Sequence, residues 1–191
     1  MILLLCGASG TGKDTIRKEL VENYGYENIP IYTNRPMRSN EKNGIDYQFV
    51  PIEVFEQLEQ NDFFCETSSF SVYDNKELWK YGTPKDVFEP NGNDLRIMIT
   101  NPSAITNFSN IVPRTSYCVC QLTATPDTIK KRLKERGDDR GEIIRRMKAD
   151  IDDFYDLRFD IIIPNDDEPL EKIAFDVDMY YRCWKAGKEN E

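Results

Sequence analysis

The sequence contains no histidine and only five cysteines among its 191 residues. Without histidine, the chain cannot use an imidazole as a general base or as a metal ligand. The cysteines are odd in number and lack the paired spacing of zinc sites. They are typical of reduced, mostly buried thiols in a cytosolic protein. Any catalysis must therefore depend on Lys, Arg, Asp, Glu or Tyr.

The sequence also lacks a long hydrophobic run, an internal repeat and an excess of positive charge. Its first apolar run, Met1–Cys6, is six residues long and has no basic leader, unlike a signal peptide or a membrane span. A net charge of −9 argues against binding to nucleic acid or to an anionic membrane. The composition predicts a cytoplasmic globular protein with one core, or one core with inserted lobes, and we expect a monomer or a homodimer.

The most informative segment is a glycine-rich turn between an apolar run and a helix-forming stretch. Six residues of strand character precede the turn, and the sequence from Lys13 onward has helical spacing of Ile16, Leu20 and Val21. This arrangement predicts a phosphate-binding loop, because glycines allow backbone N–H groups and a helix N-terminus to face a polyphosphate. The residues of the loop predicted to bind the polyphosphate are Gly7, Ala8, Ser9, Gly10, Thr11, Gly12 and Lys13. A glycine-rich turn without a ligand is the less favoured interpretation.

The residue after Lys13 departs from the usual phosphate loop. Ser or Thr normally stands there and contacts Mg²⁺, but this chain has Asp14, followed by Thr15. A carboxylate is also a suitable magnesium ligand and would accept a triphosphate that carries its metal. The other interpretation of Asp14 is an acidic residue that stabilises the first helical turn. Asp14 is thus predicted to bind Mg²⁺ or to stabilise the helix start, and both residues are assigned to the ATP site.

Alternating strand and helix patterns predict an α/β fold with a parallel sheet flanked by helices. The expected strands are 1–6, 29–33, 95–100, 116–122 and 159–163, and the expected helices are 13–23, 102–108, 125–136, 142–155 and 168–185. Residues 34–93 are richer in turn residues and aromatics, with a short strand at 47–50 and a helix at 52–61. We therefore predict a nucleotide-binding core of residues 1–33 and 94–191 and an inserted lobe of residues 34–93.

Ligands bind at the carboxyl ends of the strands in such a sheet, and arginines follow the expected strand 29–33. Arg35 and Arg38 flank a proline-stiffened turn and could clamp one phosphate with their guanidinium groups. Tyr47 could donate its hydroxyl to the same phosphate, although aromatic residues in strands usually serve packing. Two arginines in a loop are also common on a solvated surface. The segment is a candidate second anion site.

Positive charge is concentrated in residues 130–148, which contain nine basic and four acidic residues. One interpretation is a pair of solvated helix faces. The other is a glycine-flanked lid, residues 136–146, that closes over transferring phosphates and excludes water. One arginine delivered to a transferring phosphoryl group can be worth roughly 10³–10⁵ in rate.

These segments together resemble guanylate kinase, within the nucleoside monophosphate kinase group. The matching motifs occur in the family's order along residues 1–167: Gly7–Lys13, Thr33–Arg38, Glu41–Phe49, Tyr81–Thr83, Arg132–Gly137, Ile143–Met147 and Ile163–Asp167. The phosphate loop is shared by many nucleotide-binding proteins. The arginine segment, the turn before Tyr47 and the Tyr81–Thr83 motif are the specific part of the resemblance.

The resemblance implies roles for individual residues. Acceptor-phosphate binding is implied for Arg35, Arg38, Tyr47 and Tyr81. Glu66 would read the guanine edge, with Thr83 beside the base and Asn101 at the position of a family aspartate. Arg136 and Arg146 match lid arginines, Arg132 approaches the ATP site, and Asn165 lies near the adenine. Catalytic roles are implied for Lys13, Arg35, Arg136 and Arg146.

Four departures from the family pattern concern mainly the base site. They are Asp14, Ile31 in place of a frequent serine, Asn101 in place of aspartate, and a 66–81 segment longer by roughly six residues. Glu77 within that segment is a rival of Glu66 as the base-reading carboxylate. The phosphate sites therefore match better than the base site.

The resemblance implies an ATP-dependent guanylate kinase: MgATP and GMP or dGMP give ADP and GDP or dGDP. Mg²⁺ would be the cofactor, and the partners would be small-molecule nucleotides. One alternative is a related kinase with another nucleoside monophosphate or a phosphorylated sugar as acceptor. A second is a guanylate-kinase-like binding module without catalysis, which the intact phosphate loop and the lid arginines disfavour.

Overall fold

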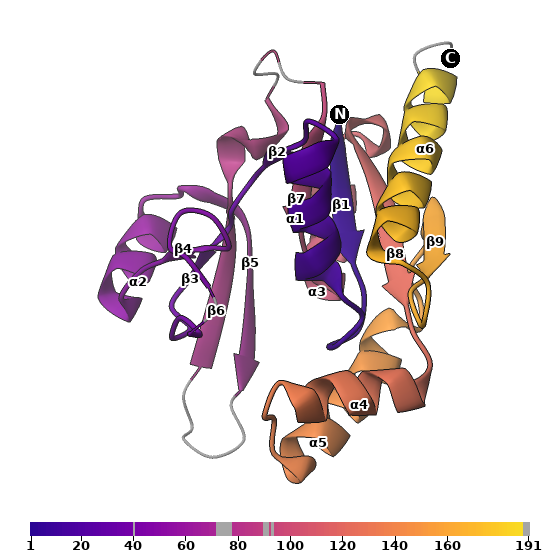
Figure 1. Cartoon of the computed structure of the whole chain (residues 1–191). Helices are drawn as coiled ribbons and strands as arrows, with labels where there is room; N and C mark the ends of the chain where they lie inside the picture. The colour runs from indigo at the N-terminus through magenta and orange to yellow at the C-terminus, as the bar shows by residue number, and fades with distance from the viewer. Residues whose placement is uncertain (40, 72–77, 90–91, 93, 189–191) are drawn as a thin grey trace.

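The computed structural model describes residues 1–39, 41–71, 78–89, 92 and 94–188. Its centre is a five-stranded sheet in the order β2-β7-β1-β8-β9, and all of its strand pairs are parallel. The strands are β1 (Ile2–Cys6), β2 (Glu27–Asn28), β7 (Arg96–Ile99), β8 (Tyr117–Thr123) and β9 (Ile161–Pro164). The predicted parallel sheet flanked by helices is confirmed (Figure 1).

Both faces of this sheet are covered, because its strands are apolar on both sides. Leu3 and Leu5 of β1 pack on one face with α1 (Lys13–Asn23) and α6 (Leu170–Lys188). Ile2 and Leu4 pack on the other face with α3 (Pro102–Ile111). All four side chains are fully buried, as expected for a central strand of a parallel sheet. Helices α4 (Pro126–Glu135) and α5 (Arg140–Phe154) lie beyond one end of the sheet (Figure 1).

A second, four-stranded sheet has the order β4-β3-β6-β5 and is accompanied by α2 (Ile52–Gln60). Its strands are β3 (Tyr32–Thr33), β4 (Gln48–Phe49), β5 (Phe64–Ser71) and β6 (Leu78–Pro84). The antiparallel hairpin of β5 and β6 is its longest part. Aromatic rings of Tyr32, Phe55, Phe63 and Phe64 contact one another with centroids 4.8–5.5 Å apart and fill the space between the hairpin and α2.

The prediction of one strand at 29–33 was wrong. β2 ends at Asn28 and pairs with β7 in the first sheet, whereas β3 pairs with β4 and β6 in the second sheet. The chain thus changes sheets between residues 28 and 32, and residues 32–33 belong to the second sheet although the sequence assigned them to the core. A run of apolar residues shows that a segment is extended, but not which partner it finds. The β5–β6 hairpin was not predicted either.

A buried ion pair joins the two parts of the molecule. Arg17 of α1 donates to the carboxylate of Asp46 at 2.5 Å, and both side chains are at most 3% exposed. Asp46 also accepts the backbone N–H of Lys42 and so holds the turn that leads to Tyr47. The helix that follows the glycine-rich turn is therefore tied directly to the turn before β4.

Three of the five cysteines, Cys6, Cys118 and Cys120, are buried in the first sheet as free thiols, Cys65 is partly buried and Cys183 is exposed. Burial raises the pKa of the Cys6 thiol to about 12, so it stays protonated and unreactive. Among the described residues, no group of three or more Cys, Asp or Glu is arranged to hold a metal ion. Of the helices in the described ranges, none is both long and apolar enough to cross a membrane.

Candidate functional site

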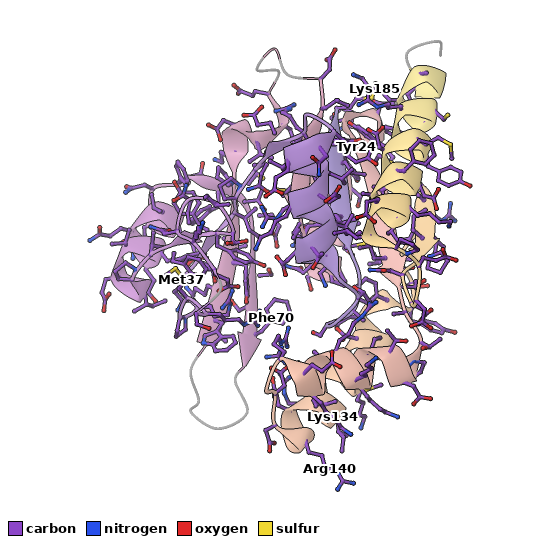
Figure 2. All side chains as sticks on the ribbon, viewed as in Figure 1. Tyr24, Met37, Phe70, Lys134, Arg140 and Lys185 are labelled. Atoms are coloured by element: carbon purple, nitrogen blue, oxygen red, sulfur yellow. The ribbon has the colours of Figure 1, made fainter. Side chains whose placement is uncertain are left out.

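A cavity of about 740 Å³ lies where the glycine-rich turn, the second sheet and α5 meet. Most of the predicted site residues line it: Gly7, Ser9, Gly10, Gly12, Lys13, Asp14, Thr15, Arg38, Tyr47, Tyr81, Asn101, Arg132, Arg136, Arg146 and Asn165. Figure 2 labels one of its lining residues, Phe70, between the second sheet and the helices α4 and α5. Five predicted residues do not line it: Ala8, Thr11, Arg35, Glu66 and Thr83.

The glycine-rich turn is held in shape from behind by Asn165. The side-chain amide of Asn165 donates to the Thr11 carbonyl at 2.8 Å, and both residues are almost fully buried. Gly12 has φ +91°, and a Cβ atom there would lie 2.5 Å from the Asn165 amide nitrogen. A side chain at position 12 would therefore displace the Asn165 amide and break its hydrogen bond to the loop. Asn165, predicted near the adenine, is thus positioned to shape the phosphate loop.

Lys13 is held by the loop's own carbonyl groups. Its Nζ donates to the carbonyl oxygens of Gly7 at 2.7 Å and Ala8 at 2.9 Å. Burial lowers the pKa of the Lys13 ammonium group, an effect that the carboxylates of Asp14 and Asp150 oppose. The cation thus sits in the cavity with partners that an anionic ligand could replace.

A carboxylate from α5 occupies one N–H of the loop. The backbone N–H of Ser9 donates to Asp150 at 3.0 Å, although 141 residues separate them in sequence. Burial raises the pKa of Asp150, while the Ser9 N–H and the Lys13 charge act in the opposite direction. A backbone N–H of a phosphate loop that bonds a carboxylate can equally bond a phosphate oxygen. The contact shows that this side of the loop accepts anions.

The opposite wall of the cavity carries a second group of cationic and hydroxyl side chains. Arg38, Tyr47 and Tyr81 line it, and the two tyrosine rings lie 5.9 Å apart. The pKa of the Arg38 guanidinium is lowered by burial and by the neighbouring charges of Arg35, Arg136 and Arg146. Guanidinium groups repel each other at close range, so their convergence indicates a site that is completed by an anion.

Arg35 differs from its predicted place, because it does not reach the cavity. It is 4% exposed and forms two hydrogen bonds to Glu41, at 2.7 and 3.1 Å. Its guanidinium also lies 5.3 Å from the centre of the Tyr47 ring. Glu41 in turn accepts the backbone N–H of Arg38 at 2.7 Å. In this conformation Arg35 fixes the turn that presents Arg38 and the ring of Tyr47.

Glu66 lies at the start of the hairpin, on β5, and is 5% exposed. Burial raises the pKa of Glu66 to about 7, and the neighbouring polar side chains of Asn107, Ser68 and Thr83 reduce this shift. Asn107 of α3 donates to its carboxylate at 3.5 Å. A buried carboxylate whose pKa lies near neutrality is typical of a functional site. Its rival Glu77 lies outside the described residues.

Asn101 has both of its amide atoms in use. Its side-chain oxygen accepts the backbone N–H of Ala104 at 2.9 Å and caps α3, and its nitrogen donates to the Ser68 hydroxyl at 2.9 Å. Asn101 therefore connects α3 to the Glu66 strand as well as lining the cavity. Ile31, 5% exposed, lines the same region, and its apolar side chain offers no hydrogen bond.

Three arginines of α5 and of the segment before it are paired with nearby carboxylates. Arg136 bonds Asp138, and Arg145 and Arg146 both donate to Glu142, at 2.8 and 2.5 Å. All three arginines line the cavity. Arg132 instead donates to the carbonyl groups of Asn165 and Asp166, at 2.8 and 2.7 Å. Several guanidinium groups thus line the cavity. Most of them must release their present carboxylate or carbonyl partners before they can bind a ligand.

Asp14 is exposed at the start of α1 and lines the cavity next to Lys13. A single carboxylate suits Mg²⁺, which usually takes one or two carboxylates, water and substrate phosphates rather than a complete protein cage. The donor set therefore fits a magnesium ion that arrives with a nucleotide, and it does not fit a structural metal.

Sequence reasoning missed three features of the cavity and its surroundings. Asp150 follows Arg146 by four residues, so helical spacing could have placed it on the same face. Asn107 reaches Glu66 only because α3 packs on β5, a contact with no local sequence signal. Phe70 and Trp79 line the cavity from the unpredicted hairpin.

Comparisons with known proteins agree with this geometry. The family model described as guanylate kinase matches residues 1–181. The chain is 32% identical to a guanylate kinase of Neisseria gonorrhoeae over 182 residues, which cover 92% of this chain and 84% of that protein. It is 30% identical to a guanylate kinase of Caldanaerobacter subterraneus over 181 residues, 91% of this chain and 84% of the relative.

A solved structure has the same fold. The crystal structure of guanylate kinase from Anaplasma phagocytophilum superposes with a TM-score of 0.66, and the alignment covers 97% of this chain and 86% of that one. Sequence identity in this pair is 21%, so the superposition supports the architecture of the two sheets and their helices.

Proposed function

Because this chain belongs to the guanylate kinase family of nucleoside monophosphate kinases, we propose that it transfers the γ-phosphoryl group of ATP to GMP or dGMP. One observation supports this most directly. A single cavity is lined on one wall by most of the phosphate loop, including Lys13, and on the other by Arg38, Tyr47 and Tyr81. Two anion sites that face each other are what transfer between two phosphates requires.

The reaction needs no general base, which suits a chain without histidine. A phosphate monoester is largely ionised near neutral pH, so an acceptor oxygen can attack the γ-phosphorus directly while ADP leaves. Lys13, Arg136 and Arg146 would offset the charge on the transferring group once they exchange their present partners for phosphate oxygens. Arg35, predicted to be catalytic, is supported here as the residue that positions Arg38 and Tyr47 through Glu41 and its ring contact.

We assign three parts to this function. With the boundary moved so that β3 joins the second sheet, residues 1–31 and 94–191 would bind ATP, residues 32–93 would bind the acceptor, and residues 136–146 would act as the lid. Arg136 is paired with Asp138 and Arg146 with Glu142. These pairs support a lid whose arginines stay bound to carboxylates until phosphate oxygens replace those carboxylates. Reduced cysteines and the acidic composition support a cytoplasmic protein that binds nucleotides, as a monomer or a homodimer.

The direct test is a coupled assay of ADP release with a panel of nucleoside monophosphates and their deoxy forms. We expect GMP and dGMP to be used and AMP, CMP and UMP to be used at least about 10³-fold less well, since an unpaired buried polar group disfavours the wrong base. Failure of every purine monophosphate would refute the proposal. A non-guanine acceptor is the second candidate, favoured by the apolar Ile31 and the capping role of Asn101.

Asp14 is proposed as a ligand of Mg²⁺, which would neutralise phosphate charge when bound with ATP. Replacing Asp14 by serine should shift the magnesium concentration for half-maximal ATP binding severalfold, because a hydroxyl is a weaker ligand than a carboxylate. Calorimetry of ATP binding at a series of magnesium concentrations measures this shift without turnover. An unchanged titration would leave Asp14 as a residue that stabilises the start of α1.

Asp150 should compete with ATP for the Ser9 N–H. Replacing Asp150 by alanine removes this competitor and one negative charge near the loop, and we expect ATP to bind about tenfold more tightly. Glu171→Ala, an exposed change of equal charge on α6, is the matched control and should leave the affinity unchanged. Weaker ATP binding by the Asp150 variant would instead show that this carboxylate assists the nucleotide.

The affinity for GMP should depend on the protonation of Glu66. The Glu66 carboxyl has a pKa of about 7, and only its ionised form can accept both N–H groups of the guanine edge. Lowering the pH from 7 to 6 reduces the ionised fraction of such a group from about a half to about a tenth, so it should raise the KM for GMP about fivefold. The same pH series with Glu66→Gln is the control, because that variant has nothing to titrate there, and a similar slope in both proteins would contradict the assignment.

A further inference from the structure

Three cross-strand pairs of the β5–β6 hairpin lie one behind another on the same face. Glu66 pairs with Thr83, Ser68 with Tyr81, and Phe70 with Trp79. Residues two apart in a strand point to the same side, and successive pairs of this kind are roughly 6.6 Å apart. In the proposed function the residues of the first pair contact the guanine base. In the second pair, Tyr81 binds the acceptor phosphate. The third pair, both aromatic, has no assigned role.

The third pair faces the place where the phosphates would meet. Phe70 and Trp79 line the same cavity as Lys13, Arg145 and Arg146. The Phe70 ring lies edge-on to the ring of Tyr81, with centroids 5.7 Å apart. Figure 2 labels Phe70 at the end of β5, between the hairpin and the helices α4 and α5. Phe70 and Trp79 therefore lie two residues further along the hairpin than the Tyr81 pair, on the side of the proposed lid.

Trp79 also has a donor without a partner. Its indole Nε1 is buried and makes no hydrogen bond within the part of the chain that the structure describes. An indole N–H is only a donor, and a buried tryptophan normally satisfies it. The ring of Trp79 lines the cavity together with Arg38, Tyr47 and Tyr81, so a small shift of the ring when a ligand binds would bring this covered donor to an oxygen of a bound phosphate.

We propose that Phe70 and Trp79 form an aromatic wall beside the transferring phosphoryl group, and that Trp79 donates its indole N–H to a phosphate oxygen of the bound nucleotides. The wall also keeps water from the γ-phosphorus. If water attacked there instead of the acceptor oxygen, ADP would leave and inorganic phosphate would form in place of GDP. This role rests on the proposed function and makes Trp79 a residue for phosphate binding and for the choice of acceptor over water.

Two substitutions separate the donor from the wall. Trp79→Phe keeps a ring but removes the N–H, and should raise the Kd for GMP about tenfold with little added hydrolysis. Trp79→Ala removes both, and should also raise the ratio of inorganic phosphate to GDP formed from ATP about tenfold. Leu78→Ala, an exposed neighbour on the same strand, is the control and should change neither quantity. Wild-type affinity in Trp79→Phe, or a wild-type product ratio in Trp79→Ala, would overturn the proposal.

Fluorescence gives a reading that needs no turnover. The chain has two tryptophans, and Trp184 lies on α6 stacked on Tyr181, outside the cavity lining. In a Trp184→Phe variant, the emission of Trp79 should shift as GMP, and separately ATP, is added. If no nucleoside monophosphate is phosphorylated, the proposed function fails, yet this titration still shows whether Trp79 meets a phosphate. Unchanged emission at saturating concentrations of both nucleotides would overturn the role of Trp79.

Discussion

Replacing Lys13 by alanine should lower kcat for phosphoryl transfer by about 10³-fold while the protein stays folded. Lys13 is the cation of the phosphate loop that faces the cavity, and catalysis of phosphoryl transfer depends mainly on positioning and on the neutralisation of charge. Its present hydrogen bonds go to the carbonyls of Gly7 and Ala8, which water can satisfy after the substitution. The lost rate would therefore report on the reaction and not on the fold.

The measurement is kcat with saturating ATP and GMP, with thermal unfolding recorded in parallel. Lys18→Ala on the same helix is the matched control, since the Lys18 side chain is 44% exposed and its Nζ lies 3.7 Å from the Asp46 carboxylate, outside hydrogen-bond distance. A Lys13→Ala enzyme with wild-type kcat would remove the phosphate loop from the mechanism. A large drop in both variants would point to damage to α1 instead.

Replacing Glu66 by glutamine should lower kcat/KM for GMP by about 10²-fold and leave the affinity for ATP unchanged. The guanine edge presents two neighbouring N–H donors, and a glutamine side chain can accept only one of them and sets its own NH₂ against the other. Unpairing a buried charged hydrogen bond typically costs 2–5 kcal/mol. Because Glu66 lies in the second sheet, away from the phosphate loop, the ATP site should not sense the change.

A substrate panel makes this prediction specific to the base. The glutamine variant should lose discrimination between GMP and AMP, because the repulsion that the carboxylate exerts on the adenine edge is gone as well. Asn107→Ala, which removes one donor to Glu66, should raise the pKa of Glu66 further and weaken GMP binding at neutral pH. Equal GMP rates in the wild-type and glutamine enzymes would assign base reading to another carboxylate, with Glu77 the first to test.

What the sequence could and could not predict follows the range of the interactions involved. The phosphate loop, α1 and the central strands were predicted because glycine spacing, strand character and helical periodicity are local properties. Asn165 was assigned to the site, but its bond to Thr11 joins residues 154 positions apart and was not foreseeable. The same holds for Asp150 and Ser9.

The second sheet was the larger failure, for a related reason. Residues 29–33 have the apolar composition of one strand, yet the strand of the first sheet ends at Asn28, and only Tyr32 and Thr33 form a strand, in the second sheet. The rich aromatic content of residues 34–93 indicated an insertion, but not that β5 and β6 form a long hairpin. The sequence also did not reveal the ion pair of Arg35 with Glu41, because the choice of this partner depends on the folded turn although Glu41 is close in sequence.

The buried bond between Arg17 and Asp46 has a consequence for how the two substrates communicate. One end is anchored in α1, the helix proposed to bind ATP, and the other in the turn before Tyr47, which is proposed to bind the acceptor. If the donor shifts α1 when it binds, Asp46 would move with the helix and change the acceptor pocket. Thermodynamic reciprocity then requires that whichever nucleotide arrives first alters the grip on the second by one common factor.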